Sequence, residues 1–243
     1  MAETNHEEKP DWTLYYWGIE STGKGRGEYA RLMFEVAKVP YLEVNTPNVI
    51  LPLIDRSGTS GSAPFPAFAV PMITGPRGVC ISQTIAICSY LGKRFGLYPD
   101  PEQEFQALQI ALSIQDFHSD GRACFHPKEL YASYFTQTEE AKVAVAKFCE
   151  GRLHHWLNHF EHHYVHNNPS GTPGYFVGSR MTYVDIMMYH VLTAAAHQFP
   201  EAWNSNTAIP NIKAFRERIE AIPALAEFIK SERYRAFEGN SMM

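Results

Sequence analysis

Residues 70–91 read VPMITGPRGVCISQTIAICSYL, and this stretch decides the fold. It predicts two short strands at 72–73 and 79–81, because apolar residues flank a Gly-Pro-Arg-Gly turn. A helix is expected at about 83–95, and Gly96 stands where helices commonly end on glycine. Two strands joined by a tight turn and followed by a helix predict one end of a small sheet.

The preceding residues complete that sheet. Residues 13–17 are rich in aromatic and β-branched side chains and predict a first strand. Apolar residues at helical spacing predict a helix at 28–37, and a second strand is expected at 41–44, after Pro40. The stretch 46–66 has four prolines and predicts mostly loop with one short helix. The order of elements indicates a small α/β domain with a mixed sheet.

The chain changes character after residues 97–101, a proline-containing linker. Later segments have the apolar spacing of long helices. The predicted helices lie at about 102–123, 138–166, 181–197 and 210–230, the last interrupted at Pro223. The sequence therefore predicts a tail at 1–11, an α/β domain at 12–96 and an all-helical domain at 102–243.

The charge, the length of the apolar runs and the cysteine spacing exclude several classes of partner and location. The 243 residues carry a formal net charge of −5, which argues against nucleic acid as a main partner. No apolar run approaches the ~20 residues that span a bilayer. The polar, acidic N-terminus resembles neither a secretory signal nor a transit peptide. The four cysteines are far apart and form no CxxC pair, which suits reduced thiols in the cytosol. We expect a cytoplasmic protein that binds neither nucleic acid nor a membrane.

Tyr16 is the first candidate for chemistry, because it closes the first predicted strand at an open edge of the sheet. A phenol that donates a hydrogen bond to a sulfur stabilises the thiolate, since a hydrogen bond to the charged form lowers the thiol pKa. Strand alternation sends Tyr15 and Tyr16 to opposite faces, so one of the two is expected in the core.

A second candidate region combines a backbone edge with a helix start. Val70 precedes Pro71, and a cis bond there leaves the Val70 N–H and C=O free for a peptide ligand; an ordinary trans proline is the alternative. Gln83 and Thr84 lie at a junction of strand and helix, where unpaired N–H groups can hold a carboxylate. A plain helix cap by Ser82 or Thr84 is compatible with that role.

Two further patterns are interpreted as structural. Thr182 and Asp185 have the spacing of a capping box at the start of a very apolar helix. A stripe of histidines with HxxxH spacing could in principle bind zinc, but it points away from the apolar stripe of the same helix, and we expect a solvated face and no metal. These histidines are His155, His159, His162 and His166.

Taken together, five segments resemble the soluble glutathione S-transferase family. They are residues 14–17, 26–32, 70–73, 81–91 and 181–186. The resemblance spans about residues 13–230, and it depends on the order and spacing of the segments rather than on one motif. The amino-acid sequences of residues 26–32 and 81–91 are most similar to those of a group of bacterial and fungal members.

The resemblance implies a thioredoxin-like N-terminal domain, an all-helical C-terminal domain and a homodimer. It implies that glutathione is the co-substrate, with its cysteinyl backbone against Val70 before a cis Pro71 and its γ-glutamyl carboxylate at Gln83 and Thr84. It makes Tyr16 the thiolate-stabilising residue of the tyrosine-type classes. The implied activity is transfer of glutathione to a small electrophile, without a metal.

The turn after Tyr16 looks a few residues longer than in the common tyrosine-type members. Serine-type classes use a hydroxyl near the start of the following helix, so Ser21 and Thr22 are the alternative thiolate stabilisers. Arg26 lies near that helix start and is a candidate electrostatic support. Tyr15 remains a lesser candidate beside Tyr16.

Two other functions stay open. A glutathione-binding carrier or interaction protein with little turnover keeps the same site. A glutathione-dependent thiol–disulfide oxidoreductase or peroxidase needs a cysteine at the end of the first strand or the start of the first helix, and none of the four lies there. The sequence does not identify the electrophile, but it suggests walls for its pocket. These are Phe117, Cys124, Phe125 and His126.

Overall fold

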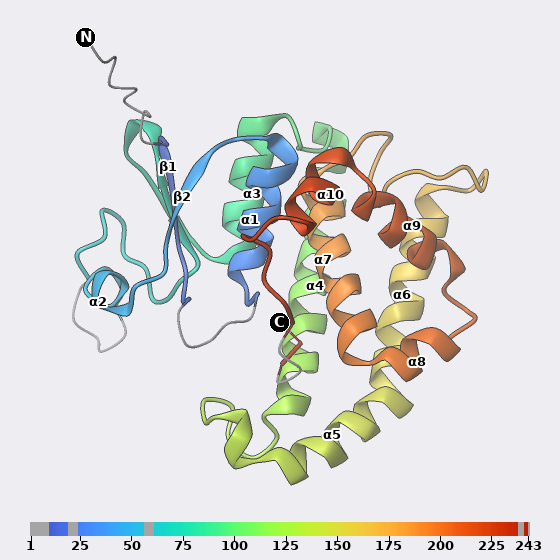
Figure 1. Ribbon diagram of the computed structural model, residues 1–243. Helices are drawn as coiled ribbons and strands as arrows, with labels where there is room; N and C mark the ends of the chain where they lie inside the picture. Colours follow the sequence, from blue (N-terminus) through green and yellow to red (C-terminus); the bar gives the residue numbers. More distant parts are fainter. Residues whose placement is uncertain (1–9, 19–23, 56–60, 238–240, 243) are drawn as a thin grey trace.

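The computed structural model describes residues 10–18, 24–55, 61–237 and 241–242, and its first part is built on a four-stranded sheet (Figure 1). The spatial order is β2-β1-β3-β4. β1 pairs with β2 in parallel and with β3 antiparallel, and β3 pairs antiparallel with β4. The strands are β1 (Trp12–Tyr15), β2 (Tyr41–Val44), β3 (Met72–Gly75) and β4 (Val79–Ser82). The mixed sheet expected from the sequence is therefore present.

The helices of this part cover the two faces of the sheet unequally. α1 (Gly27–Ala37) and α3 (Thr84–Phe95) lie between the sheet and the later helices (Figure 1). Their apolar side chains share one continuous core with β1 and the helical part. The short α2 (Pro47–Ile50) lies on the opposite face and contributes to a second, smaller cluster. Gly96 ends α3 in the left-handed region, as its position predicts.

The remainder of the described chain is helical. The helix bounds are α4 (Glu104–Phe125), α5 (Thr138–Glu150), α6 (Arg152–Asn167), α7 (Tyr183–Gln198), α8 (Pro200–Ser205), α9 (Pro210–Glu220) and α10 (Pro223–Ile229). α7 is buried on nearly all sides and contacts α1, α4 and α9. A thioredoxin-like α/β part followed by an all-helical part is the fold class that the sequence predicts.

Three sequence-based expectations need correction. The single helix expected at 138–166 is two helices, because Gly151 adopts a backbone conformation outside the helical region (φ −141°, ψ −73°). The short α8 was not predicted, although Pro200 stands at its first helical position. The first strand ends at Tyr15, so Tyr16 follows the strand instead of closing it, while its N–H still donates to the Val44 carbonyl at 3.0 Å.

The start of α7 confirms the predicted capping box. The Asp185 carboxylate accepts hydrogen bonds from the backbone N–H groups of Thr182 and Phe176, both at 2.8 Å. Burial raises the pKa of Asp185 to about 6, although these N–H groups act in the opposite direction. Asp185 therefore fixes a buried helix start.

The histidine stripe of α6 is exposed at all four predicted positions, which confirms a solvated face. Within the described ranges, no group of three or more His, Cys, Asp or Glu side chains is placed to hold a metal ion. The described helices also include none that is long and apolar enough to cross a membrane.

Candidate functional site

The register of the sheet brings the predicted site residues to one edge. Tyr15 of β1 and Ser82 of β4 both pair with Met72 of β3. The residues that follow Tyr15 and Ser82, and those that precede Met72, therefore lie at the same end of three neighbouring strands. They are Tyr16, Val70, Pro71, Gln83 and Thr84.

Val70 offers a backbone edge at this end of the sheet. The Val70–Pro71 peptide bond is cis. Among the described residues, none forms a backbone hydrogen bond with Val70. Its side chain is buried in the smaller cluster, together with Tyr16 and Met72. The N–H and C=O of Val70 can therefore pair with the backbone of a bound peptide.

The start of α3 lies beside this edge and carries no side-chain cap. The first hydrogen bond at the helix start runs from the Ile87 N–H to the Gln83 carbonyl at 2.9 Å, so the preceding N–H groups of the first turn are left without helical partners. Gln83 is exposed and has a positive φ of 74°, which is uncommon for a residue with a side chain and is often found at functional sites. Thr84 is buried. This helix start suits a carboxylate ligand.

Tyr16 is packed tightly against the turn that precedes α1. Its hydroxyl oxygen accepts the backbone N–H of Arg26 at 2.8 Å. A Cβ added to Gly25 or Gly27 would lie 2.4 or 2.5 Å from the Tyr16 side chain, so only glycine fits at these positions. Among the described residues, none accepts a hydrogen bond from the Tyr16 hydroxyl. The phenol proton is therefore available for a ligand.

Cationic side chains surround this phenol. Burial raises the pKa of Tyr16 above its ordinary value, while the Arg26 N–H and the charges of Arg31, Arg26 and Arg122 act to lower it. The Arg31 guanidinium carbon lies 5.7 Å from the centre of the Tyr16 ring. The Arg26 guanidinium lies against the side-chain amide of Gln115 on α4 and donates to its oxygen at 3.0 Å when the amide is turned so that its oxygen faces the arginine. The same positive field favours any thiolate placed next to Tyr16.

Arg31 and Arg122 were missed by the sequence analysis. Arg31 is almost completely buried and pairs with Glu28 on the same helix, and the i, i+3 spacing of these two charges is a signal that the sequence does carry. Its guanidinium donates to Glu43 of β2 and to the carbonyl of Lys24, which holds the turn before α1. No pattern in the sequence singles out Arg122.

The lesser candidates for the thiolate role and the suggested walls of the electrophile pocket find less support in the structure. Tyr15 is half-buried beside the smaller cluster. Ser21 and Thr22 lie outside the described residues. Phe117 is wrong as a wall of the electrophile pocket, because it is fully buried in the helical core against Trp156 and Phe160. Among the other suggested walls, Cys124 and Phe125 are also buried, and His126 is half-buried.

The four cysteines are free thiols, and none belongs to the turn between Tyr16 and α1. Cys88 is fully buried in α3, and burial raises the pKa of its thiol far above the ordinary value. Burial also raises the pKa of the Cys124 thiol to about 12. Neither thiol has the depressed pKa of a nucleophilic cysteine.

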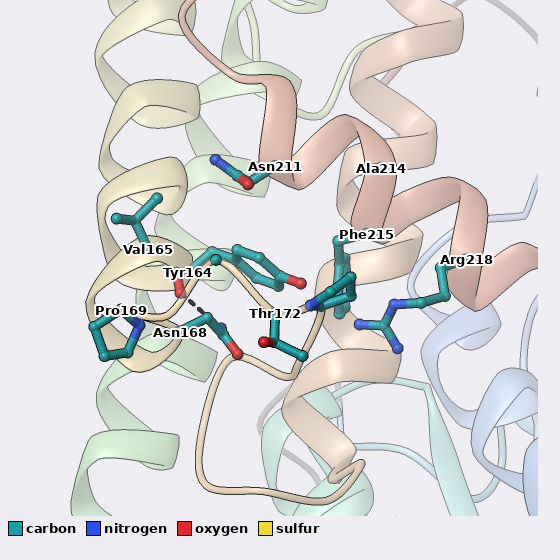
Figure 2. Close-up of a pocket in the computed structure, with 11 residues that line it drawn as sticks. Tyr164, Val165, Asn168, Pro169, Thr172, Asn211, Ala214, Phe215 and Arg218 are labelled. Atoms are coloured by element: carbon teal, nitrogen blue, oxygen red, sulfur yellow. Dashed lines mark hydrogen bonds between the residues drawn. The ribbon is translucent and has the colours of Figure 1, made fainter.

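One cavity of about 230 Å³ lies in the helical part of the chain (Figure 2). It is formed by the end of α6, the loop that follows and α9, with Tyr164, Asn168, Phe215 and Arg218 among its walls. Figure 2 shows the Arg218 guanidinium beside the Phe215 ring. None of the predicted site residues lines this cavity.

Comparison with known proteins agrees with the architecture. The family described as "Glutathione S-transferase, C-terminal domain" matches residues 126–232. S-crystallin SL11 of Nototodarus sloanii is 26% identical over 231 residues, which cover 94% of this chain and 100% of the crystallin. A glutathione S-transferase of Plasmodium falciparum is 23% identical, over 90% of this chain and 95% of its own.

A solved structure shares the fold over most of both chains. It is a glutathione S-transferase of Necator americanus, described as monomeric, with a TM-score of 0.68 and 20% identity, covering 93% of this chain and 99% of its own. The chain therefore has the fold of the soluble glutathione S-transferases, and residues 126–232 match the C-terminal domain of that family.

Proposed function

We propose that the protein is a glutathione S-transferase of the tyrosine type, which activates the glutathione thiol and joins it to a small electrophile. One observation carries the proposal: the sheet brings a free backbone edge, an uncapped helix start and a buried phenol to one place. Each of these features matches one part of glutathione. The names of the relatives support the same activity.

In this proposal Val70 pairs with the cysteinyl backbone of glutathione. The γ-glutamyl carboxylate lies at the start of α3, where the unpaired N–H groups, the Thr84 hydroxyl and the Gln83 amide donate to it. Replacing Gln83 and Thr84 together with Ala is expected to weaken glutathione binding about tenfold or more, as measured by calorimetry. Unchanged affinity in the double variant would contradict this placement.

The Tyr16 hydroxyl performs the activation. In this proposal its oxygen accepts the Arg26 N–H, and its own proton is donated to the glutathione sulfur. Burial keeps this proton on the phenol at neutral pH, because it raises the pKa of Tyr16. Donation to the sulfur favours the thiolate. The thiolate then forms a C–S bond with the electrophile, and the electron pair of the broken bond departs with the leaving group.

A pH–rate profile tests this role. Tyr16→Phe keeps the ring but removes the donor, so we expect near-normal glutathione affinity and a rate about tenfold lower at neutral pH. Tyr15→Phe is the matched control, and Ser21→Ala and Thr22→Ala test the serine-type alternative. If Tyr16→Phe keeps the wild-type profile while a Ser21 or Thr22 variant shifts it upward, the tyrosine assignment is wrong.

The alternative is a glutathione-binding carrier with little turnover, which shares the binding residues. A panel of electrophiles and peroxides with glutathione separates the two, because a carrier binds glutathione but converts none of them. An oxidoreductase is disfavoured, since neither Cys88 nor Cys124 has a depressed pKa and no cysteine stands in the sequence between Tyr16 and α1.

The proposal also includes a cytoplasmic homodimer, with an α/β domain at 12–96 and a helical domain at 102–243. Sedimentation analysis measures the oligomeric state. This test is needed because one similar structure is described as monomeric. The expected grouping with bacterial and fungal members stays a prediction, because neither Nototodarus sloanii nor Plasmodium falciparum belongs to those groups.

A further inference from the structure

A second cavity, of about 350 Å³, lies between α7, α9 and the segment that follows α10. Three cationic side chains line it: Lys24 from the turn before α1, Arg216 from α9 and Arg235 from the segment after α10. We call it the basic cavity. None of the residues proposed to bind glutathione lines it.

The carboxylates that pair with these cations stand behind them, outside the cavity lining. Lys24 pairs with Glu28 at 3.1 Å, Arg216 with Glu220 at 3.1 Å and Arg235 with Glu43 at 2.8 Å. Arg31 shares two of these carboxylates, since it pairs with both Glu28 and Glu43. This cluster therefore holds four cations against three carboxylates, and the surplus positive charge favours an anion in the cavity.

One of the cations is incompletely satisfied. The Nε of Arg216 is buried and has no hydrogen-bond partner among the described residues. Lys24 is almost completely buried, and burial lowers its pKa while Glu28 acts to raise it. A buried donor without an acceptor costs free energy that a ligand oxygen can recover. Arginine also presents a planar set of donors that matches a phosphate group.

The remaining wall of the basic cavity is aromatic. Phe237 lines it and stacks on His197 of α7, with ring centres 5.0 Å apart. Tyr234 also lines it, and the Lys24 ammonium lies 3.2 Å from the centre of its ring. An occupant thus meets both cations and aromatic rings in the same cavity. This combination suits an anionic head with an apolar body.

We propose that the basic cavity binds a small organic phosphate, with the phosphate on Arg216, Arg235 and Lys24 and the apolar part against Phe237. Convergence of three cations from three separate segments favours the dianion of a phosphate ester over a carboxylate. The site is separate from the proposed glutathione site and does not depend on it. It lies directly behind the turn next to Tyr16, because Arg235 also donates to the Trp17 carbonyl at 3.3 Å.

Calorimetry with phenyl phosphate as the probe tests the site, without any turnover of glutathione. We expect saturable binding at a ratio of one, unaffected by saturating glutathione. Arg216→Gln is expected to weaken binding about tenfold or more. Arg152→Gln is the matched control, because Arg152 is exposed on α6 and pairs with Asp120 away from the cavity. Melting curves verify that both variants fold.

A second variant tests the apolar wall. Phe237→Ala is expected to weaken phenyl phosphate several-fold while leaving the affinity for inorganic phosphate unchanged. Equal affinity for inorganic phosphate and phenyl phosphate would overturn the assignment to an organic ligand, and equal affinity for benzoate would make it a carboxylate site. Absence of binding, displacement by glutathione, or an Arg216→Gln variant that binds like wild type would overturn the proposal.

Discussion

The starts of α1 and α7 show two different ways to fix a helix. α7 begins on a cap made by residues three positions apart, Thr182 and Asp185. α1 has no side-chain cap, and the N–H of Arg26 is accepted instead by the hydroxyl of Tyr16, ten residues earlier. Arg31 secures the same turn through the Lys24 carbonyl.

The two helix starts differ in what they contribute: that of α7 stabilises the fold, and that of α1 positions a residue proposed for catalysis. A local cap such as that of α7 depends on few other residues and can be recognised in a sequence. The start of α1 depends on partners far apart in the chain, and in return it holds a phenol whose proton remains available. Loss of the α7 cap should therefore cost stability, whereas loss of the α1 contacts should cost activity.

The largest effect is expected for Asp185→Ala. It leaves the buried N–H groups of Thr182 and Phe176 without acceptors, which should lower the free energy of unfolding by about 3–4 kcal/mol. Urea denaturation measures it, and the folded fraction should keep its specific activity. Asp100→Ala is the control, because the Asp100 carboxylate is exposed and its partner among the described residues is the exposed Arg180, so a change within about 0.5 kcal/mol is expected. A similar loss of unfolding free energy in Asp185→Ala and Asp100→Ala would contradict the stabilising role of the α7 cap.

The same carboxyl predicts a pH dependence. Burial raises the pKa of Asp185 to about 6, above the value of 3.8 that applies when the chain is unfolded. Between these values the folded protein binds the proton and the unfolded chain does not, so stability falls as pH rises from about 4 to about 6. We expect urea unfolding to show a decline about 2–3 kcal/mol larger in the wild type than in Asp185→Asn over this window. If the unfolding free energies of the wild type and of Asp185→Asn changed in parallel with pH, this pH dependence would not come from Asp185.

At the start of α1, Gly27→Ala should cost both stability and activity. The new Cβ would lie 2.5 Å from Tyr16 Cγ, and displacing the ring should cost about 2 kcal/mol, more than the ~1 kcal/mol that alanine adds to helix propensity. The conjugation rate of the folded protein should fall as Tyr16 moves. Gly151→Ala is the control, because nothing lies within 4 Å of its added Cβ. A fully active Gly27→Ala would show that the position of Tyr16 is less critical than we infer.

The smallest effect is expected for Arg235→Gln, which removes bonds to Glu43 and to the Trp17 carbonyl. Unfolding should become easier by only about 1 kcal/mol, because the side chain is partly exposed. The rate with glutathione should nevertheless fall about two- to fivefold, since the turn beside Tyr16 is loosened. Arg233→Gln, which breaks a pair with Glu35 on α1 but none with the turn, should keep the rate. Equal rates in the two variants would contradict the link.

Local patterns were sufficient for most of the fold. The four strands, the cap of α7 and the glycine end of α3 all depend on neighbouring residues, and each was predicted. The break at Gly151 was missed, because the apolar stripe continues across it and a single glycine is often tolerated in a helix. Phe117 was misplaced because an apolar residue on a helix fits a core as well as a pocket wall.

The site was predicted only in part. The candidates at the sheet edge came from local patterns and from the resemblance, and the register of the sheet places them at the same edge. Partners across long separations could not be read from the sequence. Glu43, for example, binds Arg31, twelve residues away, and Arg235, 192 residues away.

The contact between Arg235 and the Trp17 carbonyl has a consequence for biosynthesis. A nascent chain that has left the ribosome as far as α9 already contains Tyr16, Val70, Gln83 and Thr84, and it can form the whole sheet. It does not yet contain Arg235, whose guanidinium holds the Trp17 carbonyl 218 residues earlier. The turn beside the phenol is therefore completed only after residue 235 has been synthesised, so a chain that reaches α9 has all the residues proposed to bind glutathione but lacks a contact that holds this turn.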